Sequence, residues 1–246
     1  MNIKQMIKMG MLGGGNVQSY VDLTKSIDLT SLLVFYPLNE ISGTTAINAE
    51  GTGARNATYS NITLNSDTSP FGEGSPTFNG LTSAVDIYSA SLASAFNNNT
   101  FSLNLWFKRN PLDSAVRTLT NIGVNASNLI SVLQINSSTV RVRYLYVGTA
   151  RDVNITTSSD AWNMYTMTYS IPANEMKVSF NGSQYGSTLT TLSAWSEGIS
   201  AGRCYIGVSD STLNAPGKGS CAYYSFWNKA LTQTEITTLY NNGPTF

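Results

Sequence analysis

The sequence predicts an all-β fold, a two-sheet antiparallel jelly-roll sandwich with a short C-terminal helix and an extended N-terminal arm. Three observations predict this fold. Short segments that alternate apolar and polar residues recur along most of the chain, with turn residues between them. One strong helix signal occurs, close to the C-terminus. The 246 residues suffice for one large sandwich. We therefore expect an arm over residues 1–30 and one domain over residues 31–246.

The strands are expected from Ser31 onwards. The segment FSLNLWFKR (101–109) shows the pattern clearly, because every second residue from Phe101 to Phe107 is apolar and so lies on one face of a strand. A dozen or so short strands of this kind favour two packed antiparallel sheets. The clearest expected strands are SLLVFYPL (31–38), SAVDIY (83–88), FSLNLWFKR (101–109), LISVLQI (129–135), VRVRYLYV (140–147), NMYTMTYS (163–170), EMKVSF (175–180), CYIGV (204–208) and SCAYYSFW (220–227).

Turn and helix signals complete the pattern. Asn181 and Gly182 form a two-residue hairpin signal, because a type I′ turn needs a positive φ at both positions. Thr232 precedes Glu235 by three residues, which is the spacing of a capping box at the start of a helix. A helix is therefore expected over about residues 232–240, with its apolar side packed on a sheet.

The composition excludes several classes of function. Charged residues make up 11% of the chain and the formal net charge is zero, so no overall field attracts nucleic acid or an anionic membrane. The chain has no histidine, which removes the commonest general base and zinc ligand. No apolar run is long enough to insert into a membrane. Lys4 and Lys8 interrupt the N-terminus, which makes it a poor signal peptide.

The N-terminal segment differs from the rest of the chain. Its apolar side chains precede a flexible joint of three glycines at 13–15. We expect residues 1–30 to bind another chain, by strand addition to a neighbour's sheet edge, and we expect the protein to be an oligomer. The alternative is an arm that folds back on its own domain. The residues expected to make the assembly contact are Ile3, Met6, Ile7, Met9, Met11 and Leu12.

Three passages resemble a known family. They are FYPLNEISGTTAINAEGTG (35–53), SPTFNGLTSAVDIYS (75–89) with FSLNLWFK (101–108), and FWNKALTQTEITTLYNNG (226–243). They are similar to the concanavalin A-like lectin/glucanase superfamily, in its laminin-G-like and pentraxin-like branch, of the kind found in phage and viral structural proteins. The likeness covers about residues 31–246. It implies a jelly roll that binds glycans, and it makes calcium the expected ion.

The same resemblance raises the question of glycosidase activity. Glycosidases place two carboxylates about 5 Å apart in retaining enzymes. The acidic residues here are scattered, and none share a strand two positions apart. A Ser–His–Asp site is excluded because histidine is absent. We therefore expect a protein that is not an enzyme.

Candidate binding residues follow from the chemistry of sugars, which need a flat aromatic face and polar side chains for the hydroxyl groups. Trp195 lies in a polar Gly/Ser-rich loop and Tyr185 follows the expected hairpin, so both are candidates, together with Asp210 and Asn214. The alternative for Trp195 is that it closes one end of the sandwich as a packing residue.

Calcium ligands are oxygen atoms supplied by loops. Asp67, Glu73 and Asp210 lie in stretches that read as loops, and they form the candidate calcium set. The relatives' acidic stretch in the last strand is replaced by GSCAYYSF (219–226), which has no acid. The alternative is therefore that these three residues are ordinary solvated acids and that no cofactor is bound.

Two functions remain open. In the first, the protein is a non-catalytic virion component, such as a capsid decoration or tail fibre protein, that attaches to another assembly protein through residues 1–30 and displays a jelly roll to host glycans. In the second, it is a secreted lectin or carbohydrate-binding module. What residues 1–30 contact discriminates between the two.

Overall fold

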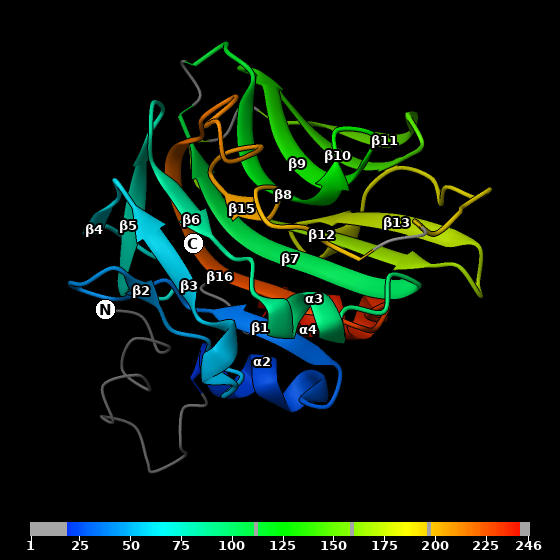
Figure 1. Ribbon diagram of the computed structural model, residues 1–246, viewed down its shortest axis with the longest axis horizontal. Coiled ribbons are helices and arrows are strands. Elements are labelled where there is room, and N and C mark those ends of the chain that lie inside the picture. The colour runs from blue at the N-terminus through cyan, green and yellow to red at the C-terminus, as the bar shows by residue number, and fades with distance from the viewer. Residues whose placement is uncertain (1–18, 111–112, 158–159, 196–197, 242–246) are drawn as a thin grey trace.

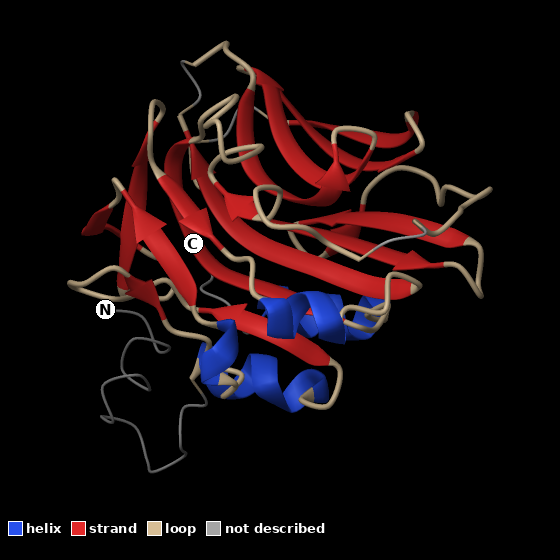
Figure 2. Cartoon of the chain, in the orientation of Figure 1, coloured by secondary structure: helices blue, strands red, loops and turns tan. Residues whose placement is uncertain are grey.

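A computed structural model describes residues 19–110, 113–157, 160–195 and 198–241. Over these ranges the chain folds into two eight-stranded sheets that stack face to face (Figures 1 and 2). Each pair of neighbouring strands is antiparallel, which confirms the predicted all-β sandwich. A sandwich of this kind buries the inner face of each sheet against the other.

The strand order of the first sheet, sheet A, is β14 (Ser183–Gln184), β13 (Glu175–Phe180), β12 (Trp162–Ser170), β7 (Thr100–Arg109), β16 (Lys218–Trp227), β5 (Gly74–Asn79) and β4 (Thr63–Thr68). The eighth strand of this sheet, β1 (Leu32–Tyr36), pairs with β16. The strand order of the second sheet, sheet B, is β11 (Thr149–Thr156), β10 (Thr139–Tyr146), β9 (Asn128–Asn136), β8 (Arg117–Asn125), β15 (Tyr205–Ile206), β6 (Ala84–Asp86), β3 (Ala57–Ser60) and β2 (Thr45–Ala46).

The C-terminal helix is present as predicted. Helix α4 (Gln233–Asn241) follows the expected capping box. The Thr232 hydroxyl oxygen accepts from the Glu235 backbone N–H at 3.2 Å, and the Glu235 carboxylate accepts from the Thr232 backbone N–H at 2.8 Å. These two bonds satisfy N–H groups that the first turn of a helix leaves without partners.

Three further helical segments were not predicted from the sequence. They are α2 (Tyr20–Asp28), α3 (Ala90–Ala95) and the single 3₁₀ turn η1 (Gly53–Arg55). Ser19 caps α2, since its hydroxyl accepts from the Asp22 backbone N–H at 3.1 Å, and Ser89 caps α3 in the same way. A serine followed by a short mixed segment is a weak signal in a chain rich in serine, so these helices depend on their tertiary contacts.

Two apolar cores hold the domain together. The larger core lies between the sheets, and its members on β7 are the four alternating residues predicted from the sequence. The smaller core lies between sheet A and the two helices α2 and α4, which cover the outer face of that sheet (Figure 1). It gathers Tyr20, Leu23, Leu32, Phe35, Trp106, Trp162, Met164, Ala222, Tyr223, Trp227, Leu231, Ile236 and Leu239.

Part of the expected N-terminal arm is therefore a helix that packs on its own domain. Tyr20 and Leu23 point to the same side of α2 and are 7% exposed each. Burial of a large apolar side chain stabilises by roughly 1.5–3 kcal/mol, which favours this contact over an extended arm. The assembly residues expected at positions 3–12 lie outside the described residues. The expectation that the segment before Ser19 binds another chain therefore stays a prediction. No helix within the described ranges is long and apolar enough to span a membrane.

Candidate functional site

The outer face of sheet B is the uncovered face of the sandwich. Helices α2 and α4 occupy the outer face of sheet A, whereas no described helix lies on the far side of sheet B (Figure 2). Its strands β8 to β11 align a row of polar residues: Asn121, Ser131, Arg143 and Asp152. Asn121 and Ser131 are buried, and the Asn121 amide donates to the Arg203 carbonyl of the loop before β15, whereas Arg143 and Asp152 are each 25% exposed. The part of this face that a ligand can reach is therefore the strands β10 and β11 and the loops at the rim.

A polar pocket of about 470 Å³ lies at the rim of sheet B. Three segments form it: the end of β8, the loop that precedes β15, and the loop that follows β15. Cross-strand contacts bring them together, because the Ser200 hydroxyl donates to the Val124 carbonyl at 2.6 Å and the Ser211 N–H donates to the Gly202 carbonyl at 3.1 Å. The lining residues within the described ranges are Val124, Asn125, Ser200, Ala201, Gly202, Arg203, Asp210, Ser211, Thr212 and Asn214.

Asp210 organises one wall of the pocket. Its carboxylate accepts from the Thr212 hydroxyl at 2.6 Å and from the Asn214 amide at 3.0 Å, and these bonds fold the 209–214 loop back on itself. Burial alone would raise the pKa of Asp210, but the hydrogen bonds from Thr212 and Asn214 outweigh it and the pKa is lowered. The carboxylate is therefore ionised at neutral pH.

Arg203 presents the positive charge of the pocket. One guanidinium nitrogen, Nη1, lies 3.4 Å from Oδ2 of Asp210, and this long contact is the only ion pair of Arg203 within the described residues. The side chain is 29% exposed and lines the pocket. An arginine has five N–H donors and no acceptor, which leaves Arg203 able to donate to hydroxyl, carbonyl or carboxylate oxygens of a ligand.

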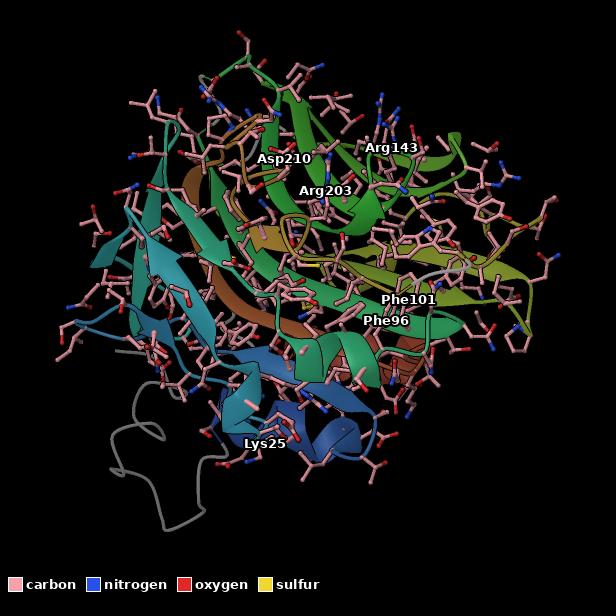
Figure 3. The ribbon with its side chains drawn as sticks, viewed as in Figure 1. Lys25, Phe96, Phe101, Arg143, Arg203 and Asp210 are labelled. Atoms are coloured by element: carbon pink, nitrogen blue, oxygen red, sulfur yellow. The ribbon has the colours of Figure 1, made fainter. Side chains whose placement is uncertain are left out.

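A second pair of charges lies farther along the same face. Arg143 donates to both oxygens of Asp152 at 2.8 Å, which is bidentate geometry, and Arg141 approaches the same carboxylate at 3.3 Å. Figure 3 shows Arg143, Arg203 and Asp210 above strands β8 to β10, whereas Phe96 and Phe101 lie between the layers. The outer face of sheet B thus carries fixed polar groups well beyond the pocket.

The four candidate sugar-binding residues are only partly brought together. Asp210 and Asn214 both line the pocket. Trp195 is 5% exposed and stacks on Tyr144 with ring centroids 5.6 Å apart, so it closes the sandwich as a packing residue and offers no free face. Tyr185 contacts Phe180 of β13 and accepts from the Thr156 N–H at the end of β11, away from the pocket residues. The expected aromatic platform is therefore wrong for Trp195, because a ring from another strand covers it.

The candidate calcium ligands are not brought together either. Asp67 pairs with Lys108 at 3.1 Å and accepts from Ser220, and Glu73 accepts from the Tyr223 hydroxyl at 2.9 Å. Asp210 is engaged by its own loop and by Arg203. Within the described ranges no group of three acidic or cysteine side chains is placed to hold a metal. The three acids therefore do not form one ligand set.

Sequence reasoning missed every lining residue of the pocket except Asp210 and Asn214, and the polar ones among those missed include Asn125, Ser200 and Arg203. They lie on separate segments, and Arg203 looks like an ordinary loop cation before a short strand. A usable signal would have been the pairing of β15 with β8, which brings the loops together, but a two-residue strand is too short to predict.

The two stacked sheets, the open face of sheet B and the polar rim pocket define a lectin-like jelly-roll domain. The chain belongs to the concanavalin A-like lectin/glucanases superfamily, because the laminin G-type model of that superfamily matches residues 82–237, more than half of the chain. This confirms the family predicted from the three sequence passages. No curated protein matches the chain.

Solved structures share the fold at low sequence identity. The binding domain of botulinum neurotoxin serotype D/C has a TM-score of 0.63 at 14% identity, over 87% of this chain and 52% of that one. The botulinum neurotoxin DC binding domain in complex with rat synaptotagmin II has a TM-score of 0.65 at 14% identity, with the same coverage. A Trypanosoma rangeli sialidase in complex with sialic acid has a TM-score of 0.63 at 17% identity, over 86% of this chain and 33% of that one. The chain thus spans about half, or a third, of these proteins, and the likeness concerns the fold.

Proposed function

We propose that this protein is a non-catalytic glycan-binding domain whose ligand occupies the Arg203 pocket at the rim of sheet B. The observation that carries the proposal is a polar pocket on the one sheet face that the described helices leave uncovered. Sugars present hydroxyl groups that pair with arginine, amide and hydroxyl side chains, and the pocket is lined by these groups. The binding domains among the structural neighbours support the proposal at the level of fold.

The state of the carboxylates supports a non-catalytic role. A glycosidase needs an acid with a raised pKa beside an ionised partner. Here Asp113 pairs with Arg117 at 2.8 Å and Asp210 with Arg203 at 3.4 Å. Burial raises the pKa of both carboxyl groups, but their hydrogen bonds outweigh it and the pKa of each is lowered, so these two carboxylates are poor proton donors. Incubation with polysaccharides should release no reducing sugar, and turnover that one acid-to-Ala change abolishes would contradict this.

The test is a glycan array followed by calorimetry on a soluble ligand that the array selects. We expect Arg203→Ala to weaken binding at least tenfold, because a hydrogen bond to a charged group contributes about 1.5–3 kcal/mol. The matched control is Lys177→Ala, a partly exposed cation on β13 of sheet A that pairs with Glu175. Equal affinities of the two variants, or no glycan bound by the wild-type protein, would refute the proposal.

We further propose that the segment before Ser19 attaches the domain to a virion or a similar assembly. What supports this is the sequence, in which apolar residues and a glycine joint precede α2. The secreted lectin is the alternative. Limited trypsin digestion at Lys4 and Lys8 discriminates between them: cleavage of the isolated protein and protection in the assembled particle support attachment. Equal resistance of the isolated monomer supports a segment that folds on its own domain.

A further inference from the structure

Strand β11 (Thr149–Thr156) is the terminal strand of sheet B and pairs with β10 on one side (Figure 1). The pairing runs through eight residues in continuous register, and the strand holds no proline. The other described edges are less suited to a further strand: β2 and β14 have two residues each, β4 has an irregular register, and the Asn48 side chain covers β1 by accepting from the Phe35 N–H at 2.9 Å. A long and regular edge presents unpaired backbone groups to another chain.

The turn before β11 determines which of its residues face outward from the sheet edge. Val147 and Gly148 have φ angles of 45° and 75°, as a two-residue type I′ hairpin requires. The residues that flank such a turn form a hydrogen-bonded pair, and hydrogen-bonded and non-hydrogen-bonded pairs then alternate along the two strands. The odd-numbered residues of β11 therefore bond to β10, and the even-numbered residues direct their N–H and C=O groups away from it. The contact just past the strand agrees, since the Thr157 N–H donates to the Ser138 carbonyl just before β10 at 2.8 Å.

Three outward N–H groups of β11 are unpaired. Those of Ala150, Asp152 and Asn154 have no acceptor among the residues that the structure describes. The fourth, that of Thr156, already donates to the Tyr185 hydroxyl at 3.2 Å. The stretch of the edge that is open to a further strand therefore runs from Ala150 to Asn154.

The side chains beside these groups complement a second copy of the same strand. Val153 and Ile155 belong to the core between the sheets, so Asp152 and Asn154 lie on the outer face of β11. The Arg141 Nε donates to the Asn154 Oδ1 at 3.1 Å, and the Asn154 Nδ2 has no acceptor in the described part of the chain. An ionised carboxylate such as that of Asp152 only accepts hydrogen bonds. The edge thus holds an amide donor two residues away from a matching acceptor.

We propose that β11 pairs antiparallel with β11 of a second copy of this chain, about a two-fold axis at Val153. This register sets Asp152 opposite the partner's Asn154, so the amide donates to the carboxylate and the two residues exchange backbone hydrogen bonds. A register centred on Asp152 or on Arg151 sets like charges opposite each other, which destabilises a strand pair. The segment before Ser19 fits this edge less well, because its apolar side chains then lie beside polar ones.

The dimer joins two copies of sheet B into one continuous sheet. Residues opposite each other in a strand pair lie on the same face, so the outer faces of both copies look to the same side. The two Arg203 pockets, at the rims of these sheets, are thereby held at a fixed separation. A gain in affinity for a multivalent glycan rests on the function proposed above, whereas the dimer rests on β11 alone.

Sedimentation equilibrium of the full chain tests the dimer. We expect a monomer–dimer equilibrium whose dissociation constant rises at least tenfold in Asn154→Asp, because this change sets carboxylates opposite each other. The matched control is Gln184→Glu, the same chemical change at an exposed amide of edge strand β14, and it should leave the equilibrium unchanged. A wild-type protein that stays monomeric at about 1 mM overturns the proposal. So does a dimer that Ile7→Asp disrupts and Asn154→Asp leaves intact, since the segment before Ser19 then makes the contact.

Introduced cysteines test the register. Val153→Cys places the new thiol on the axis, where facing Cα atoms of a non-hydrogen-bonded pair lie about 4.5 Å apart, within reach of a disulfide. Ala150→Cys is the control, because it is the more exposed site but its two copies lie about 20 Å apart in this register. Under mild oxidation Val153→Cys should form a covalent dimer and Ala150→Cys should not, and the native Cys204 and Cys221 are buried. Equal cross-linking of Ala150→Cys, or none of Val153→Cys, contradicts the proposal. If Val153→Cys does not fold, the Asn154→Asp measurement decides.

Discussion

The indole Nε1 of Trp106 donates a hydrogen bond to the hydroxyl oxygen of Tyr20 at 3.1 Å. This bond crosses from β7 of sheet A to helix α2, and the Tyr20 ring packs against Phe71 and Tyr223 at centroid distances of 4.2 and 4.8 Å. Tyr20, the second of the described residues, thus joins the smaller core. The contact fixes α2 on the outer face of sheet A. The outer face of sheet B is therefore the side of the sandwich that no described helix covers.

The first prediction concerns this contact. Tyr20→Ala should lower the free energy of unfolding by about 3–5 kcal/mol, as other buried aromatic truncations do. Tyr20→Phe keeps the ring and leaves the Trp106 N–H without its acceptor, which costs about 1–3 kcal/mol. Urea denaturation measures both. A loss below about 1 kcal/mol for Tyr20→Ala would show that α2 is not held by the domain.

The second prediction concerns pH and the attachment of α2. Hydrogen bonds from Thr30, with further help from Ser31 and Lys229, lower the pKa of Asp28 from 3.8 to about 2. A carboxyl group whose pKa is lower in the folded than in the unfolded protein stabilises the fold at any pH above its unfolded-state pKa. The stability that Asp28 contributes is therefore lost as the pH falls from about 4 to about 2.

Asp28→Asn removes this titration but keeps an oxygen acceptor for Thr30 and Ser31. It should therefore be less stable than the wild-type protein at pH 7, and the difference should shrink as pH falls towards 2. Thermal unfolding at several pH values measures it, with the exposed Asp160→Asn as the control. A difference that stays constant with pH would show that Asp28 does not titrate in the folded state.

The third prediction concerns the cysteines. Cys204 and Cys221 are free and buried, and burial raises the pKa of Cys204 to about 12 and that of Cys221 further still. Since the thiolate is the reactive form, neither thiol should react with a disulfide reagent at pH 8 in the native protein. Both should react once guanidinium unfolds it. Rapid labelling of the native protein would mean that the sandwich opens at β15 or β16.

Local patterns in the sequence predicted the fold well. The alternation along β7 identified the inner face correctly, and the capping box located α4. What the sequence concealed is the burial of Ser102 and Asn104 on the other face of β7, which are 0% exposed. Their polarity and their alternation with apolar residues predict solvent exposure, but helices α2 and α4 cover that face of sheet A. The sequence around β7 holds no pattern that would predict this cover.

The site shows the same limit. Asp210 and Asn214 were predicted as polar residues of a loop-like stretch, and the short loop between them does bring the two side chains into contact at 3.0 Å. Trp195 appeared free because its own loop is polar, whereas Tyr144 of β10 covers it from 51 positions away. Arg203 was missed because the pocket exists only where separate segments meet.

The most direct test of the central claim is to map a bound glycan on the ¹⁵N amide spectrum of the protein, with the ligand that the array selects. We predict that the shifted amides cluster at residues 124–125, 200–203 and 210–214 and that Arg203→Ala removes these shifts while the rest of the spectrum stays unchanged. Shifts confined to sheet A and its helices, or to the Tyr185 edge, would contradict the assignment of the binding site to the rim of sheet B.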